Sequence, residues 1–135
     1  MFLDASSIIA MLGDEAEGDI FANALSAAPT PVTSPVAVWE AVAGLVKEYA
    51  LSVREARAKV ADFLAVAKVR TLSVGESELA VALDAYDQFG KGRHPARLNL
   101  GDCFAYAVAK CNGAAILHKD DGFYLTDIPS VLARR

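Results

Sequence analysis

Acidic side chains are the residues of this sequence whose types and positions best suit a chemical role. Asp4 directly follows the apolar pair Phe2-Leu3, and Asp120-Asp121 closely follow the apolar run 115–117. Each run predicts a short buried strand, and ligands of open parallel sheets collect outside the carboxyl ends of the strands. The three carboxylates are therefore expected at one edge of a sheet.

Two further acids lie on predicted helices and can point toward the same edge. Glu40 lies inside the otherwise apolar stretch 36–46, where a carboxylate without a partner would be costly to bury. Asp102 lies in the first turn of a helix that Asn99 is expected to cap. Carboxylates gathered this closely repel one another unless a cation neutralises them, and Mg²⁺ or Mn²⁺ suits such oxygen ligands. The pattern predicts a site for one or two divalent ions.

A carboxylate site of this kind predicts hydrolysis of a phosphodiester. Bound ions can activate water for in-line attack and stabilise the charge on the leaving oxygen. Ser6 can reach water or phosphate at the metal. A polyanionic substrate also needs positive charge, and the one strongly basic stretch lies just before Asp102. The residues of this stretch that we expect to contact the substrate backbone are Lys91, Arg93, His94 and Arg97.

Each of these acids also has a purely structural interpretation. Asp4 and Asp102 are suited to cap helices, and Asp120 and Asp121 are suited to form a turn. Glu40 resists that interpretation because its helix is otherwise apolar. Two other functions remain open on the residues alone. One is a carboxylate-metal phosphatase, because an Asp after a strand also occurs in phosphoryl-transfer folds; the other is a non-enzymatic binding module whose acids are only caps.

Composition limits the class of protein. The 135 residues suit a single domain spanning 1–135, and the 54% apolar content indicates a globule with a core rather than a disordered chain. No apolar run reaches the ~20 residues of a membrane span, and the start lacks the features of a signal peptide, so we expect a cytoplasmic protein. The formal net charge of −4 does not indicate a nucleic-acid-binding domain. Any binding of nucleic acid must therefore depend on local charge.

The elements that must position these acids alternate between strands and helices. Apolar runs predict strands at 2–3, 32–33, 69–72 and 115–117. Helical spacing predicts helices between them. Ser34 with Pro35 is a helix start, and Ser52 with Glu55 is a capping box. This alternation predicts an α/β fold with a parallel sheet covered by helices on both faces.

Three segments also match a known pattern. They are residues 2–10, Phe2-Leu3-Asp4-Ala5-Ser6-Ser7-Ile8-Ile9-Ala10; the pair Trp39-Glu40; and residues 90–106, which end in Leu98-Asn99-Leu100-Gly101-Asp102-Cys103-Phe104-Ala105-Tyr106. With these segments the chain resembles, over nearly its whole length, the PIN-domain ribonucleases, and within them the VapC-type toxins of bacterial toxin–antitoxin pairs. The resemblance implies a PIN-like three-layer α/β/α sandwich with a central, mainly parallel sheet of four to five short strands.

The resemblance has implications for the site and its partners. It implies that Asp4, Glu40 and Asp102 bind Mg²⁺ or Mn²⁺, that a fourth acid near the last strand completes the site, and that RNA is cut by hydrolysis. It also implies a homodimer. A cognate VapB-like antitoxin would lay a peptide segment across the active-site groove.

The fourth acid is not settled by the pattern. Such toxins often place Asp directly before the Phe of the last motif, whereas Gly122 precedes Phe123 here. The fourth ligand therefore remains open between Asp120 and Asp121.

Overall fold

Four short parallel strands form the central sheet of the computed structural model, which describes residues 1–134. Arg135, the last residue of the predicted domain, lies outside the described residues. The strands stand in the order β3-β2-β1-β4, with Phe2 of β1 opposite Val32 on one side and Ile116 on the other. All four predicted strands are present, as β1 (Phe2–Leu3), β2 (Val32–Thr33), β3 (Arg70–Thr71) and β4 (Ile116–Leu117).

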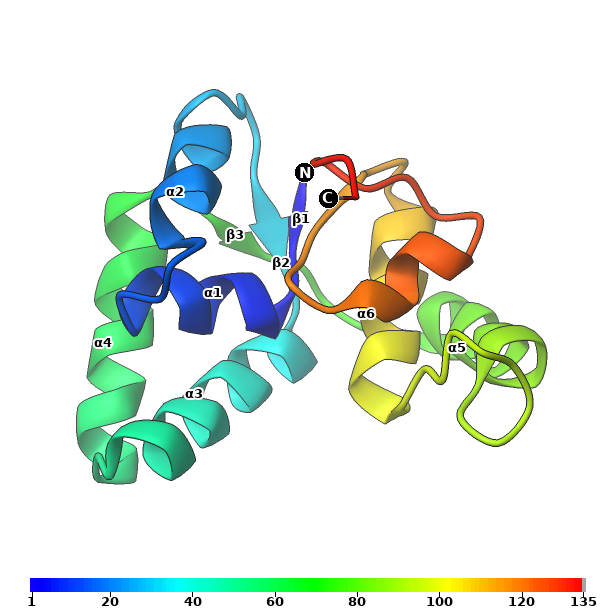
Figure 1. Ribbon diagram of the computed structural model, residues 1–135, viewed down its shortest axis with the longest axis horizontal. Helices are drawn as coiled ribbons and strands as arrows, with labels where there is room; N and C mark the ends of the chain where they lie inside the picture. Colours follow the sequence, from blue (N-terminus) through cyan, green and yellow to red (C-terminus); the bar gives the residue numbers. More distant parts are fainter. Residues whose placement is uncertain (135) are drawn as a thin grey trace.

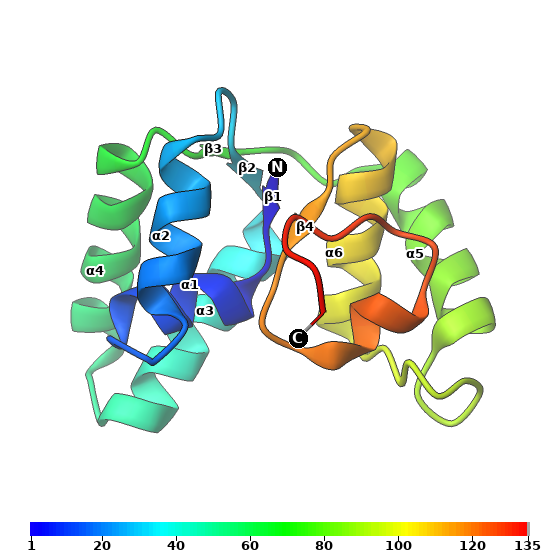
Figure 2. The ribbon, with the colours of Figure 1, turned by 45° about the horizontal axis from the view of Figure 1, so that its top comes forward.

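Helices cover both faces of this sheet and confirm the predicted three-layer sandwich (Figure 1, Figure 2). One face carries α1 (Ala5–Leu12), α2 (Gly18–Ser26), α3 (Pro35–Tyr49) and α4 (Val53–Val66). The other face carries α5 (Glu76–Phe89) and α6 (Leu100–Cys111), and a short 3₁₀ helix, Asp121–Leu125, follows β4. Among residues 1–134, no helix combines the length and the apolar character needed to cross a membrane.

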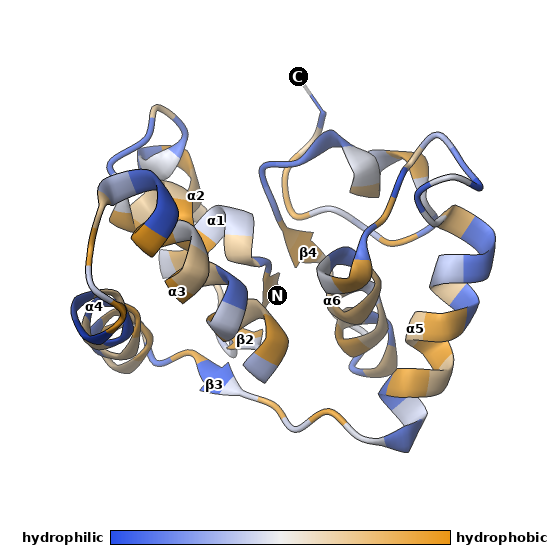
Figure 3. Cartoon of the chain, turned by 90° about the horizontal axis from the view of Figure 1, so that it is seen from below, coloured by the Kyte–Doolittle hydropathy of each residue, from blue (hydrophilic) through white to orange (hydrophobic). Residues whose placement is uncertain are grey.

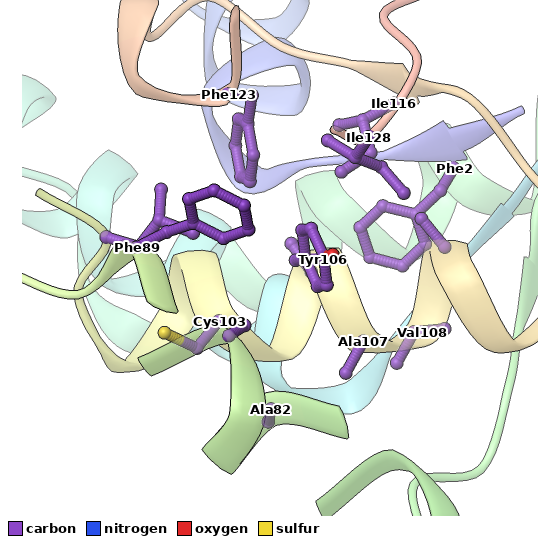
Figure 4. Close-up of a cluster of buried hydrophobic side chains, with 14 of the residues drawn as sticks. Phe2, Ala82, Phe89, Cys103, Tyr106, Ala107, Val108, Ile116, Phe123 and Ile128 are labelled. Atoms are coloured by element: carbon purple, nitrogen blue, oxygen red, sulfur yellow. The ribbon is translucent and has the colours of Figure 1, made fainter. Parts of the chain in front are cut away.

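Successive residues of β1 and β4 enter different hydrophobic cores, as the two-residue period of a strand requires. Phe2 and Ile116 pack with α5 and α6, while Leu3 and Leu117 pack with the helices of the other face. All four side chains are completely buried. Figure 4 shows Phe2, Ile116 and Tyr106 in the first of these cores. Burial on both faces holds the ends of β1 and β4 in fixed positions.

The two edges of the sheet differ. At one edge, β3 is exposed and hydrophilic, whereas β4 at the other edge is hydrophobic (Figure 3). The C-terminal segment covers β4, because Ile116 bridges to Ser130. In this bridge the Ile116 amide donates to the Pro129 carbonyl, and the Val131 amide donates to the Ile116 carbonyl, each at 2.9 Å. Pairing of this kind protects the backbone groups of an edge strand.

The helix starts agree with the predicted capping residues. The Ser34 hydroxyl accepts a hydrogen bond from the Ala37 amide at 3.1 Å, and Ser52 with Glu55 forms the expected capping box. Such caps depend on residues only three positions apart, which is why sequence alone predicts them. The helix α3, on which Glu40 lies, therefore begins at the residue that the local sequence predicts.

The strand order creates a crevice between β1 and β4. After β1 the chain adds β2 and β3 on one side, and it then crosses to the other side of β1 to form β4. Ligands of open α/β sheets bind outside the carboxyl ends of the strands at such a switch point. Asp4 and Asp120, which follow these two strands, are thereby brought to the same place.

Candidate active site

A pocket of about 320 Å³ lies at this switch point. The segments that line it are the start of α1, the turn after it, α3, the start of α6 and the segment after β4. We call it the acid pocket. Its carboxylates are those of Asp4, Glu15, Glu40, Glu48, Asp102 and Asp120. The acids that sequence reasoning placed together, Asp4, Glu40 and Asp102, do line one pocket.

Asp4 is the most deeply buried of these acids, with 3% of its surface exposed. Its Oδ2 caps α1 by accepting hydrogen bonds from the Ser6 amide at 3.2 Å and the Ser6 hydroxyl at 2.5 Å. Burial, opposed by the Ser6 hydrogen bond and assisted by the nearby charges of Asp102 and Asp120, raises the pKa of Asp4 to about 7. The structural and chemical interpretations of Asp4 therefore both hold: it caps a helix and faces the pocket.

Ser6 also forms hydrogen bonds with both sides of the crevice between β1 and β4. Its Oγ accepts a hydrogen bond from the backbone amide of Lys119 at 3.0 Å while it donates to Asp4. One hydroxyl thus links the start of α1 to the segment after β4. The position of Asp4 relative to Asp120 depends on this link.

Glu40 approaches the pocket from α3 and lies against the first turn of α6. A Cβ atom at Gly101 would overlap the Glu40 carboxylate, so the contact requires glycine at that position. Burial, with repulsion from Asp102 and then Asp120, raises the pKa of Glu40 to about 7. The presence of Glu40 in an otherwise apolar helix is thus explained, because its half-buried carboxylate faces other acids rather than the core.

Asp102 combines a cap with a place in the pocket. Its Oδ2 accepts a hydrogen bond from the Asn99 amide at 3.1 Å, and the Asn99 side chain accepts one from the Asp102 amide at 2.9 Å. Burial raises the pKa of Asp102 to about 6, opposed by the Asn99 amide and assisted by the charge of Asp120. The cap fixes the backbone of the first turn and so the direction of this carboxylate.

The two candidates for the fourth acid are placed differently. Asp120 lines the acid pocket, and its charge acts on Asp4, Glu40 and Asp102. Asp121 lies in a neighbouring pocket, and its carboxylate is 3.7 Å from the guanidinium of Arg134. Asp120 directly precedes the 3₁₀ helix and Asp121 begins it, and the two adjacent residues line different pockets.

Lys119, Glu15 and Glu48 are pocket residues that sequence reasoning did not assign to the site. The ammonium group of Lys119 lies 3.2 Å from Glu15 and 3.7 Å from Glu17, and Lys119 also lines the acid pocket. Its position directly before Asp120, after a strand, was the available signal. Glu15 and Glu48 gave no signal, because they reach the pocket only through the packing of α1 against α3.

The basic stretch before Asp102 lies to one side of the acid pocket. Lys91, Arg93, His94 and Arg97 are absent from the pocket lining among the described residues. Arg93 lies 3.4 Å from Asp87 of α5, and the His94 ring accepts a hydrogen bond from the Ala96 amide at 3.0 Å. The stretch therefore forms its own loop between α5 and α6. Only its continuation, Asn99, reaches the pocket rim.

The donor set of the acid pocket suits a hard divalent ion. Its acids offer only oxygen ligands, and the pKa values of Asp4, Glu40 and Asp102 are raised, mainly by burial and in smaller part by the neighbouring carboxylates. Within residues 1–134, no group of three or more His, Cys, Asp or Glu side chains is arranged so that it could hold a metal ion. Mg²⁺ usually keeps several waters and binds through only one or two carboxylates, so these acids need not all contact one ion.

Gly101 offers a test of the contact between α3 and α6. We expect Gly101→Ala to leave the melting temperature nearly unchanged, because the overlapping group is the end of a flexible side chain and alanine favours a helix. The displaced Glu40 carboxylate should weaken Mn²⁺ binding by about tenfold. Thermal unfolding and calorimetric Mn²⁺ titration measure the two effects. Unchanged Mn²⁺ affinity would show that Mn²⁺ binding does not require the Glu40 carboxylate in this position.

Comparisons with known proteins identify the family of the chain. A family model described as PIN domain matches residues 1–129. A Ribonuclease VapC of Mycolicibacterium smegmatis is 33% identical over 132 residues, which cover 97% of this chain and 99% of that protein. A VapC ribonuclease of Rhizobium meliloti is 34% identical, with 94% of this chain and 98% of that protein covered.

A solved structure supports the same fold. The crystal structure of VapC20 of Mycobacterium tuberculosis, described as a toxin that cleaves the Sarcin-Ricin loop, matches with a TM-score of 0.73. The match covers 94% of this chain and 95% of that one at 21% identity, so it shows the shared architecture. Together with the family match and the relatives, it leads to one assignment. The chain belongs to the PIN domain family, among the VapC ribonucleases.

Proposed function

We propose that this protein is an endoribonuclease toxin that hydrolyses RNA phosphodiester bonds with one or two Mg²⁺ or Mn²⁺ ions in the acid pocket. One observation supports the proposal most strongly. Four carboxylates from four separate segments of the chain, Asp4, Glu40, Asp102 and Asp120, line one pocket at the switch point of the sheet. Helix capping accounts for the positions of Asp4 and Asp102, but it does not account for the approach of Glu40 and Asp120 to the same pocket.

The four carboxylates would bind the ions, and neighbouring residues would keep these carboxylates in position. Ions bound there would supply an activated water and would stabilise charge on the leaving oxygen. Ser6 orients Asp4, Asn99 orients Asp102, and Gly101 lets Glu40 approach. Each carboxylate therefore has a local partner that limits its motion, as an efficient site requires.

Lys119 is the cation placed to meet the RNA at the pocket. Lys119 lines the pocket, and its ammonium group contacts Glu15 and Glu17, so a phosphate oxygen could replace one of these carboxylates. The basic loop would contact the RNA backbone farther from the cut bond, through Lys91, Arg93, His94 and Arg97. Such contacts add affinity that depends on salt rather than on sequence.

The proposed partners are a VapB-like antitoxin and a second copy of the chain, in the cytoplasm. The relatives are named VapC ribonucleases, which supports an antitoxin partner. Apolar side chains on the α5–α6 side are exposed, which supports a protein interface there. They are Leu79, Leu83, Tyr86 and Leu100.

RNA cleavage with and without metal tests the proposal. Purified protein should cut a structured RNA in Mn²⁺ or Mg²⁺, and EDTA should abolish the cleavage until excess metal is added. The ends of the products identify hydrolysis. Cleavage that persists in EDTA would contradict the metal site. Hydrolysis of p-nitrophenyl phosphate without any action on RNA would instead favour a phosphatase.

A further inference from the structure

His118 is a buried side chain that the chemistry described so far does not use. It directly follows β4, with 4% of its surface exposed, and lies behind the segment that forms the rim of the acid pocket. Its ring packs against Phe123 and Tyr124, with ring centroids 5.0 Å and 4.6 Å away. It lines the neighbouring pocket rather than the acid pocket. A polar ring held this firmly beside a site needs an explanation.

Both ring nitrogens of His118 have partners, and these partners define its protonation. Nδ1 lies 2.7 Å from the backbone carbonyl of Asp120, and Nε2 lies 2.7 Å from the Ser130 hydroxyl. A carbonyl oxygen can only accept, so Nδ1 must carry a hydrogen. The Ser130 hydroxyl can donate as well as accept, so Nε2 needs no hydrogen of its own. In the neutral ring Nε2 accepts a hydrogen bond that the Ser130 hydroxyl donates.

Ser130 is itself held in place by the sheet. It lies in the C-terminal segment that pairs with β4 through the backbone bonds between Ile116, Pro129 and Val131. A continuous set of hydrogen bonds therefore runs from the covered edge of β4, through Ser130 and His118, to the backbone of Asp120. The set is rigid at its far end because both β4 residues are completely buried.

The segment that bears Asp120 is consequently held from two sides. On one side Ser6 accepts a hydrogen bond from the Lys119 amide, and on the other side His118 donates to the Asp120 carbonyl. Asp120 is exposed, so its own side chain is not confined by packing. Its direction depends on the backbone that carries it, and His118 fixes that backbone on the side away from the pocket.

We propose that His118, supported by Ser130, is a positioning residue that holds Asp120 toward the acid pocket and Asp121 away from it. This inference rests on the proposed metal site and extends it. By this inference the C-terminal segment 129–131 helps to position Asp120, although the segment itself does not line the acid pocket. Removal of the Nδ1 donor should let the Asp120 backbone rotate, so that the fourth carboxylate is lost from the pocket for part of the time.

Mn²⁺ affinity of matched variants tests this positioning role. His118→Phe keeps the ring and loses the donor, and we expect it to bind Mn²⁺ about tenfold more weakly and to lower kcat more than it changes KM for RNA. His118→Asn places an amide donor where Nδ1 stands and should recover most of the affinity. Tyr124→Phe removes a hydroxyl from the same cluster, where it contacts the Leu132 carbonyl, and should match the unaltered protein.

The outcomes separate this inference from the proposed function. Wild-type affinity in His118→Phe would overturn the positioning role while the metal site stands. Absence of Mn²⁺ binding by the unaltered protein would overturn both. If His118→Phe does not fold, ¹⁵N NMR of the unaltered protein decides, since the Nδ1–H tautomer is expected and an Nε2–H tautomer would contradict the hydrogen bond to Asp120. Ser130→Ala should reduce the population of the Nδ1–H tautomer.

Discussion

Asparagine in place of Asp4 is expected to reduce metal-dependent RNA cleavage by at least about a hundredfold, because it removes a carboxylate from the centre of the acid pocket. The fold should persist. Asparagine caps helices as well as aspartate does, and its side-chain oxygen can still accept the hydrogen bond from the Ser6 amide. Cleavage rates in saturating Mn²⁺, with circular dichroism spectra of both proteins, measure the effect.

Asp121→Asn is the matched control for this experiment. It also removes one carboxylate from a segment that follows a strand of the sheet, yet Asp121 lies in the neighbouring pocket beside Arg134. Its cleavage rate should stay within about twofold of the unaltered protein. Full activity of Asp4→Asn, or equal losses in both variants, would show that the acid pocket is not where RNA is cut.

The second large effect concerns stability of the metal-free protein. Burial raises the pKa of Asp4 in the folded chain to about 7, from an ordinary value of 3.8 for aspartate. Between these pH values the folded state binds more protons than the unfolded state, so the free energy of unfolding falls as pH rises through this window. For a completely buried acid the loss is on the order of a few kcal/mol. Thermal unfolding in EDTA at pH 5 and pH 8 should show it.

Two comparisons isolate the contribution of Asp4. Asp4→Asn should lose less stability over the same range, because only Glu40 and Asp102 then keep raised pKa values. Both proteins contain His118, so the opposite effect of protonating that buried ring cancels between them. Addition of Mn²⁺ at pH 8 should raise the melting temperature of the unaltered protein, since an ion that binds only the folded state stabilises it. Identical pH profiles for the two proteins would contradict a buried charge at Asp4.

Local sequence determined the parts of the fold that involve residues close along the chain. The Ser34 and Ser52 caps lie where spacing predicted them, because a cap needs partners only three residues away. The pairs Phe2-Leu3 and Ile116-Leu117 form strands because both faces of each pair are buried. The placement of Asp4 at the carboxyl edge of the sheet followed from the strand that precedes it.

Tertiary structure alone decided which groups meet across the chain. No spacing rule could show that Glu40 lies against Gly101, that Ser6 contacts Lys119, or that Ser130 reaches His118. The basic loop is an instructive case, because nearness to Asp102 in sequence did not bring Lys91 or Arg93 into the acid pocket.

The amino-acid sequence by itself determined the α/β class, the helix starts and the identity of three of the acids that meet in one pocket, since these depend on short-range periodicity and capping. Only the folded chain chose Asp120 over Asp121 for the acid pocket. The physical reason is that Asp120 and Asp121 are the same residue type at adjacent positions, so only the directions of their side chains distinguish them. That direction is set by backbone contacts with Ser6 and His118, which are distant in sequence or hidden behind the site.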